Sequence, residues 1–230
     1  MKKIGIIGGI GPASTLDYYT GIIDGYRKKT GSDNYPEIII YSINMTEMIT
    51  LIEKDRWDNV TDMLTSTLKR LSNAGADIAV IASNTPHLVF DEISRQSPIP
   101  LISIVEETCN FIKAAGYQRV LTIGTLFTMK NGLYTKPLEK CGVSPLLPTE
   151  DEQSEIYSLF FPNLENGIVI PEDKEKMLVL VNQIIHNQNA DSLLLGCTEL
   201  PLMIKPGEMK IPVIDTVQIH IASIINHIAA

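Results

Sequence analysis

The chain has 230 residues, 44% of them hydrophobic, which is enough apolar material for one large folded domain or two small ones. Its net charge of −8 at pH 7 argues against a nucleic-acid partner, because proteins that bind phosphate backbones present clustered lysines and arginines. No apolar run approaches the roughly 20 residues that span a bilayer, so we expect no membrane partner either.

The cysteines are three in number and lie far apart, at Cys109, Cys141 and Cys197. This odd set matches neither a disulfide framework nor the Cys-x-x-Cys spacing of a zinc site, so we expect no metal and a reduced, cytoplasmic compartment. Cys109 and Cys141 are typical of small buried apolar residues, whereas Cys197 follows a predicted strand.

Short apolar strands alternate with stretches of helical period, which is typical of a parallel α/β sheet. The first strand runs into a glycine-rich turn and a helix that begins at Pro12, with Leu16, Tyr19, Ile22, Ile23 and Tyr26 on one face. The next predicted helix carries Trp57, Val60, Leu64, Leu68 and Leu71 and ends near Gly75. The predicted strands are residues 3–8, 37–43, 77–82, 100–103, 119–124, 143–147, 192–196 and 212–215.

An internal repeat of about half the chain length connects the two halves. Ala76-Asp77 recurs as Ala190-Asp191, an offset of 114, and the segment from Ile99 recurs from Ile211, an offset of 112. Gly8 and Gly124, each closing a strand, are 116 apart. We therefore expect two pseudo-symmetric α/β domains, residues 1–105 with about 214–230, and residues 106–213. The alternative explanation is that similar turn residues recur between the strands and helices of an α/β fold without a duplication.

Equivalent positions of this repeat carry Ser83 and Cys197, each just after a strand. Ligands bind beyond the carboxyl ends of parallel strands, so the two side chains are predicted to reach one cleft from opposite sides. We expect free N–H groups and a helix dipole near Cys197 to lower the pKa of its thiol and to favour the thiolate.

Polar residues around these positions are candidates for substrate binding. Asn84, Thr85 and Thr198 supply neutral donors suited to a carboxylate, although helix capping explains such residues equally well. His87 is either a base or a packed ring, and Glu199 is either a first-turn helix acid or a partner for a substrate ammonium group.

The turn Gly8-Gly9-Ile10-Gly11-Pro12 fits a small anion better than a dinucleotide. The dinucleotide fingerprint also requires an acid at the end of the second strand, and that strand ends at Tyr41-Ser42-Ile43-Asn44. The sequence contains no Walker motif, no His-Glu-x-x-His and no lysine in a pyridoxal setting, so we expect no cofactor.

With these segments in order, the chain resembles the aspartate/glutamate racemase family, in particular its aspartate racemase branch. The likeness runs from the first strand to the last and rests on four segments: Gly8 to Pro12, Ser83-Asn84-Thr85-Pro86-His87, Gly124 to Met129 and Gly196-Cys197-Thr198-Glu199.

The resemblance implies a cofactor-independent racemase, active as a homodimer, on aspartate, glutamate or both. Two cysteines then act on opposite faces of the α-carbon. Asn84, Thr85, Thr125 and Thr198 would hold the α-carboxylate, and Gly11, Thr128 and Glu199 complete the predicted site.

Ser83 departs from this pattern, because it stands where the family has its first cysteine. A hydroxyl hardly ionises near neutral pH, so Ser83 is at best a proton relay. The serine could be natural and impose a stereochemical preference, engineered in place of a cysteine, or the mark of a chain that binds without racemising.

A second departure concerns the distal carboxylate of a dicarboxylic substrate. The stretches where the resembled aspartate racemases carry a cation are Glu47-Met48-Ile49 and Leu164-Glu165-Asn166 here, and a carboxylate buried without a cation is strongly disfavoured. Lys54, Arg56, Lys136 or Lys174 could substitute.

Two other functions remain open beside the racemase. A related isomerase or decarboxylase, of the maleate isomerase or arylmalonate decarboxylase kind, needs only one cysteine and releases a different product. A noncatalytic binder of small carboxylates would bind aspartate without exchanging its α-proton.

Overall fold

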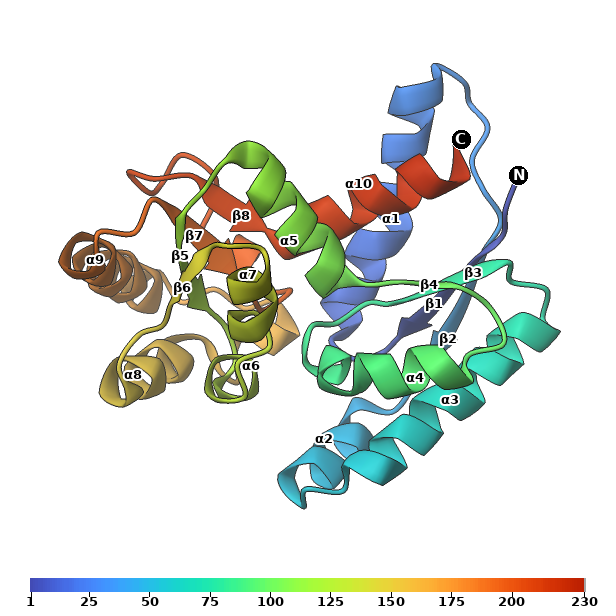
Figure 1. Ribbon diagram of the computed structural model, residues 1–230, viewed down its shortest axis with the longest axis horizontal. Coiled ribbons are helices and arrows are strands. Elements are labelled where there is room, and N and C mark those ends of the chain that lie inside the picture. Colours follow the sequence, from blue (N-terminus) through green and yellow to red (C-terminus); the bar gives the residue numbers. More distant parts are fainter. Residues whose placement is uncertain (230) are drawn as a thin grey trace. The chain divides into compact units, whose positions relative to one another are not determined.

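The computed structural model describes residues 1–229 of the chain, which form two compact units (Figure 1). Unit 1 contains Met1–Ile104 and the C-terminal segment that begins at Val217, and unit 2 contains Val105–Thr216. Each unit has a four-stranded parallel sheet with helices packed on it, which confirms the predicted α/β class.

Unit 1 has the strand order β2-β1-β3-β4. Its strands are β1 (Ile4–Gly8), β2 (Ile38–Ser42), β3 (Ile78–Ile81) and β4 (Leu101–Ile102). Its helices are α1 (Pro12–Thr30), α2 (Met45–Glu53), α3 (Trp57–Asn73), the short 3-10 helix η1 (Thr85–Val89), α4 (Phe90–Gln96) and the C-terminal α10 (Thr216–Ile228).

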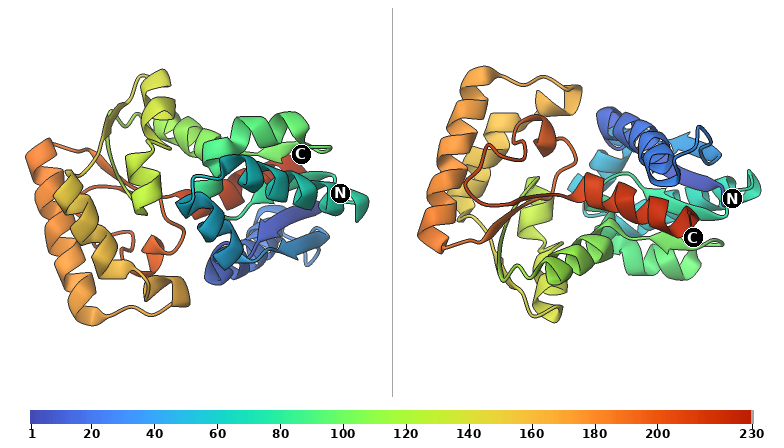
Figure 2. Two further views of the ribbon diagram at one scale, coloured as in Figure 1. Left: turned by 90° about the horizontal axis from the view of Figure 1, so that it is seen from below. Right: turned by 90° about the horizontal axis from the view of Figure 1, so that it is seen from above.

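The helix α10 packs on α1, although the whole of unit 2 separates them in the sequence (Figures 1 and 2). Two glycines of α1 make this close approach possible. A Cβ added at Gly21 would lie 2.8 Å from the Cδ1 atom of Ile221, and one at Gly25 would lie 2.4 Å from that of Ile225. The C-terminal helix therefore completes the core of unit 1.

The predicted buried face of α1 is partly wrong. Ile22 and Tyr26 of the predicted face are buried, but Leu16 and Tyr19 are 65% and 42% exposed, and Tyr18, which the prediction did not include, is buried. The reason is the neighbouring helix: α10 covers the stripe that contains the small glycines, and a pattern of large apolar residues cannot reveal that stripe. The predicted helix α3 is confirmed, and of its five apolar residues Val60, Leu64, Leu68 and Leu71 are buried, whereas Trp57 is half-buried.

Unit 2 repeats the arrangement with the strand order β6-β5-β7-β8. Its strands are β5 (Arg119–Ile123), β6 (Ser144–Leu146), β7 (Ser192–Leu195) and β8 (Val213–Asp215). Its helices are α5 (Ile104–Ala115), α6 (Leu126–Lys130), α7 (Thr135–Lys140), α8 (Glu150–Phe160), the 3-10 helix η2 (Leu164–Asn166), α9 (Pro171–Gln188) and the 3-10 helix η3 (Leu200–Leu202).

The core of unit 2 lies between its sheet and the helices α8 and α9, which run beside each other in both views of Figure 2. Leu193, Leu195 and Cys197 alternate along β7 and its extension, and all three belong to this core. The alternation therefore turns the Cys197 side chain to the same face of the sheet as the two leucines.

Hydrogen bonds outside the sheets also recur in the two units with the period of the sequence repeat. They are Lys3 N to Asp77 Oδ2 (2.7 Å) and Gln118 N to Asp191 Oδ2 (2.7 Å), Ala79 N to Pro100 O (2.9 Å) and Leu193 N to Pro212 O (2.9 Å), and Ser14 Oγ to Ala82 O (3.1 Å) and Thr128 Oγ1 to Gly196 O (3.3 Å). Equal sheet orders and matching side-chain bonds are what a duplicated domain produces.

None of the helices within residues 1–229 combines the length and the apolar character needed to cross a membrane.

Candidate active site

In unit 2, Cys197 lies at the carboxyl edge of the sheet, two residues beyond the end of β7. Only 6% of Cys197 is exposed, and its thiol donates a hydrogen bond to Oε2 of Glu199 over 3.2 Å. The same carboxylate oxygen accepts a bond from the Thr198 hydroxyl over 2.8 Å. Three consecutive residues thus form one buried hydrogen-bonded cluster.

The pKa of the Cys197 thiol lies well above its ordinary value, contrary to the sequence prediction. Burial is the main cause, and the negative charges of Glu199 and Glu165 raise the pKa further, against a hydrogen bond from the Glu199 backbone that lowers it. The helix that was expected to favour the thiolate is only the three-residue η3, which is too short to form a strong dipole.

Glu165 is the second carboxylic acid that acts on this cluster. It lies in η2 and is half-buried, and its pKa is raised by burial and by the charge of Glu199. Its neighbour Leu164 is 1% exposed and belongs to the same hydrophobic core as Cys197. Sequence reasoning singled out this stretch only for its missing cation.

The adjacent strand end of unit 2 is occupied by Thr125 and Thr128. Thr125 caps α6 by accepting from the Thr128 backbone N–H over 3.2 Å, and Thr128 donates its hydroxyl to the Gly196 carbonyl over 3.3 Å. Gly124 allows this contact, since an added Cβ would lie 3.0 Å from the Gly196 oxygen. Both threonines therefore stabilise the local fold, in addition to their predicted role as substrate ligands.

In unit 1, Ser83 and Asn84 take the equivalent place beyond β3, and both are buried, at 8% and 3% exposure. Asn84 precedes η1 without forming a side-chain capping bond, so helix capping does not explain the amide. Thr85 opens η1 and is half-buried. The structure thus keeps these three residues together at one sheet edge.

His87 is held by hydrogen bonds on both ring nitrogens. The Ile104 backbone N–H donates to Nε2 over 3.4 Å, which leaves the proton on Nδ1 to be donated to the Ser83 carbonyl over 2.9 Å. Burial lowers its pKa to about 4. The geometry favours the packed ring over the base, and it makes His87 a positioning residue for the backbone of Ser83.

The glycine-rich turn of unit 1 serves the fold in a similar way. Gly9 has φ +79° and its missing Cβ would lie 2.3 Å from the Ile43 carbonyl oxygen, so no other residue fits there. Gly11, with φ +90°, precedes α1 and its carbonyl accepts bonds from the backbone N–H and the hydroxyl of Thr15.

The four candidate cations for a distal carboxylate are divided between the two units. In unit 2, Lys174 is engaged by Glu208 over 2.6 Å, and Lys136 lies in α7. In unit 1, Lys54 and Arg56 are exposed in the connection from α2 to α3.

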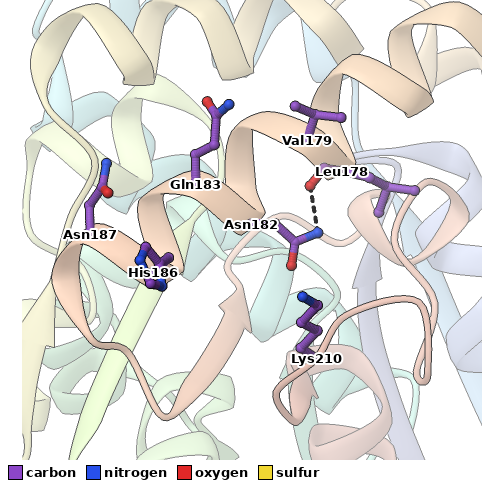
Figure 3. Close-up of a pocket in the computed structure, with 7 residues that line it drawn as sticks. All are labelled: Leu178, Val179, Asn182, Gln183, His186, Asn187 and Lys210. Carbon is purple, nitrogen blue, oxygen red and sulfur yellow. Dashed lines mark hydrogen bonds between the residues drawn. The ribbon is translucent and has the colours of Figure 1, made fainter.

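A separate surface hollow of about 660 Å³ lies along α9, between Leu178 and Asn187, with Lys210 on its other side (Figure 3). Asn182 in its wall bonds the Leu178 carbonyl over 2.7 Å, the contact dashed in the figure. None of the predicted site residues lines this hollow.

Sequence reasoning named Thr128 only as a site residue and missed its equivalence to Ser14. The two hydroxyls tie the helix after the first strand of each unit to the end of the third strand. The repeat contained the signal, because the two positions are 114 apart, like Ser83 and Cys197. It also missed the bond of 2.6 Å between Tyr18 and His220, which joins segments 202 residues apart.

Known proteins are similar to this chain over most of its length. The family model described as Asp/Glu/Hydantoin racemase matches residues 7–224. The broad specificity amino-acid racemase RacX of Bacillus subtilis (strain 168) is 26% identical over 219 residues, covering 93% of this chain and 92% of the relative. The resemblance found in the sequence is thereby confirmed at the level of the family.

Solved structures agree with this result. The crystal structure of an aspartate racemase homologue from Pyrococcus horikoshii OT3 has a TM-score of 0.87 and 38% identity, with full coverage of both chains. The aspartate racemase of Picrophilus torridus has a TM-score of 0.74 over all of this chain and 95% of its own, at 24% identity, which shows a shared fold.

Proposed function

The chain belongs to the Asp/Glu/hydantoin racemase family, and from this membership we propose that it racemises a free amino acid at the α-carbon without a cofactor, with Cys197 as the acid/base. The observation that carries the proposal is the buried Cys197 thiol at the carboxyl edge of the unit 2 sheet, hydrogen-bonded to Glu199. Ligands of parallel sheets bind at this edge.

We propose two roles for the Glu199 carboxylate: it accepts the proton of the Cys197 thiol, and it binds the ammonium group of the substrate. A substrate ammonium group beside the Glu199 carboxylate would offset its negative charge, and this lowers the pKa of Cys197 when it is needed as a base. The thiolate then forms next to the α-carbon, because the carboxylate and the sulfur are only 3.2 Å apart. Positioned proton transfer of this kind is worth about 10²- to 10⁴-fold in rate.

Ser83 occupies the equivalent position of unit 1, and the proposal pairs it with Cys197 across one substrate. Within residues 1–229 the Ser83 hydroxyl forms no hydrogen bond, so its proton is available to a ligand. A neutral hydroxyl can donate or relay a proton but is a poor base. We therefore propose that Cys197 removes the α-proton and that the two enantiomers are turned over unequally.

For the rest of the site, the proposal keeps Asn84, Thr85, Thr125 and Thr198 as ligands of the α-carboxylate. The resemblance predicts aspartate or glutamate as the substrate, and the broad specificity in the name of the Bacillus subtilis relative supports a wider range of side chains. The reaction at the α-carbon is the same in each case.

Exchange of the α-proton in deuterated buffer tests this function. One-dimensional NMR of a panel of L- and D-amino acids should show loss of the α-proton signal with the native protein. Cys197→Ala should abolish the exchange, whereas Cys141→Ala, which removes a half-exposed thiol elsewhere in unit 2, should retain it. Exchange that persists in purified Cys197→Ala would exclude Cys197 as the acid/base.

One observation favours a second candidate, an isomerase or decarboxylase that needs a single thiol. Cys197 has a thiol and its counterpart Ser83 does not. Such an enzyme would give a double-bond isomer or carbon dioxide from a suitable diacid instead of the opposite enantiomer. Calorimetric binding of an amino acid with no exchange and no product would instead identify a noncatalytic binder.

The proposal includes a homodimer in the cytoplasm. The compartment is supported by three free cysteines, which a reducing environment preserves. Sedimentation analysis would test the dimer.

A further inference from the structure

Two histidines lie in contact inside unit 1, one in η1 and one on the C-terminal helix α10. His87 and His220 are both buried, and their ring centroids are 6.4 Å apart. The ring planes are at 81°, which is an edge-to-face contact. Burial lowers the pKa of His87 to about 4 and that of His220 to about 3, so both rings are neutral near pH 7.

His220 connects three segments that are distant in the sequence. The Tyr18 hydroxyl of α1 lies 2.6 Å from its Nδ1 atom, and the Ile102 carbonyl of β4 lies 3.0 Å from its Nε2 atom. A carbonyl oxygen can only accept, so in the neutral ring Nε2 carries the proton and Nδ1 accepts from the Tyr18 hydroxyl. His220 thereby ties α10 to α1 and to the end of β4.

His87 connects the ends of β3 and β4 in the opposite tautomer. Its Nε2 atom accepts from the Ile104 backbone N–H over 3.4 Å, and its Nδ1 atom donates to the Ser83 carbonyl over 2.9 Å. Because Ile102 and Ile104 are only two residues apart, His220 and His87 hold the same short segment, one by its carbonyl and the other by its N–H. A continuous set of contacts therefore runs from α1 and α10 to Ser83.

These contacts end at the backbone of the residue that delivers a proton in the proposed reaction. Within residues 1–229 the Ser83 hydroxyl has no hydrogen bond of its own, so its place depends on the backbone that His87 holds. The His87 ring is also stacked on Phe90, with centroids 5.0 Å apart and planes at 10°. A displacement of about 1 Å at a reacting group can cost about 10²-fold in rate. Groups that orient His87 can therefore act on the reaction without touching the substrate.

We infer that Tyr18 and His220 are positioning residues for Ser83. Through His87 and the end of β4 they fix the place from which the Ser83 hydroxyl delivers a proton to the α-carbon. The inference rests on the proposed function, in which Cys197 takes the α-proton. Ser83 then gives its hydroxyl proton to the carbanion and takes one from water, which inverts the α-carbon. A proton returned by Cys197 retains the configuration, so only inversion needs Ser83.

The ratio of inverted to retained product measures this role. The L- and D-forms of aspartate, glutamate and alanine are incubated with the protein in deuterated buffer, and chiral chromatography with mass detection separates the two deuterated products. For the amino acid that exchanges fastest, Tyr18→Phe, which removes one hydroxyl and keeps the ring, should lower the initial ratio about fivefold, the equivalent of one hydrogen bond. His220→Leu removes both bonds and should lower it about twentyfold.

Two further variants separate positioning from loss of folded protein. His220→Gln keeps an amide that can donate to the Ile102 carbonyl, and it should restore part of the ratio lost in His220→Leu. Ile225→Val is the matched control, because Ile225 packs on Gly25 in the same contact between α10 and α1 and forms none of these side-chain bonds. It should lower the urea midpoint and leave the ratio unchanged.

The tautomers provide a readout that needs no substrate. ¹⁵N NMR of the native protein should show the ring proton on Nδ1 in His87 and on Nε2 in His220. Tyr18→Phe should shift the ring signals of His220. A proton on Nδ1 of His220 would overturn the inference, because Tyr18 could not then donate to that atom.

The other outcomes separate the inference from the proposed function. An unchanged ratio in Tyr18→Phe or in both His220 variants overturns the role of the residue replaced. An equal fall of inverted and retained product also overturns it, because a merely structural role lowers both. If His220→Leu does not fold, Tyr18→Phe and His220→Gln still decide the question. If the native protein exchanges none of these amino acids, the proposed function fails, and the inference fails with it.

Discussion

The two units form the same sheet edge but have different chemical groups on it. In unit 1 the segment after β3 is tied down by neutral groups: His87 bonds the Ser83 carbonyl and the Ile104 backbone. In unit 2 the segment after β7 gathers a thiol and acids instead, with Cys197 bonded to Glu199. The two units thus share a sheet order and differ in the side chains that follow the third strand.

The largest expected effect comes from erasing that difference in unit 2. Cys197→Ser gives both units a hydroxyl at the equivalent position, and a hydroxyl hardly ionises near neutral pH. We expect α-proton exchange to fall by about 10³-fold, within the range of a lost general base. NMR exchange rates measure this, with Cys141→Ser as the control, and a residual rate within tenfold of the native protein would contradict it.

Acid should lower the free energy of unfolding of unit 1 more than that of unit 2. Unit 1 contains two buried neutral imidazoles, and burial lowers the pKa of His87 to about 4 and of His220 to about 3. Their pKa in the unfolded chain is near 6.5, so the unfolded chain binds more protons below that pH. The contribution of the two neutral histidines to the free energy of unfolding of unit 1 is fully present above about pH 6.5 and decreases as the pH falls toward 4. At pH 5 the loss is roughly 2 kcal/mol per histidine.

The single tryptophan makes this measurable. Trp57 lies in α3 and reports on unit 1, whereas circular dichroism reports on both units. Urea midpoints by Trp57 fluorescence should fall between pH 7 and pH 5, and His87→Asn should reduce the slope. His186→Gln, at an exposed position of α9, should leave it unchanged. A midpoint independent of pH would show that the two rings do not govern the stability of unit 1.

Making unit 1 resemble unit 2 should have a smaller effect. Ser83→Cys adds a second ionisable thiol at the equivalent position, and we expect turnover to rise by about tenfold and the two enantiomers to exchange at more similar rates. Comparing initial exchange rates of the L- and D-forms measures both quantities. Unchanged rates and an unchanged preference would count against the pairing of residues 83 and 197.

The sequence was sufficient for the architecture because the relevant signals are local. Apolar segments that alternate with helical segments predicted the strands found within residues 1–229. The repeat offsets near 114 predicted that Ser83 and Cys197 take equivalent positions after a strand. It was insufficient where a contact joins distant segments. The buried face of α1 depends on α10, through Gly21 and Gly25. The pKa of Cys197 is raised first by burial in the core of unit 2, then by the neighbouring Glu199, and least by Glu165, 32 positions away in the sequence. Neither the contact with α10 nor the burial of Cys197 is encoded in the pattern around the residue itself.

The smallest effect tests the duplication directly. Ser14 bonds the Ala82 carbonyl in unit 1, and Thr128 bonds the Gly196 carbonyl in unit 2, both from buried hydroxyls. Ser14→Ala and Thr128→Val should each reduce the free energy of unfolding by about 1 kcal/mol, the usual cost of one such bond. Urea unfolding measures the loss, and only Ser14→Ala should shift the Trp57 transition. If Thr128→Val instead raises KM tenfold with stability unchanged, its hydroxyl serves the substrate, and the correspondence between the two bonds does not extend to their role.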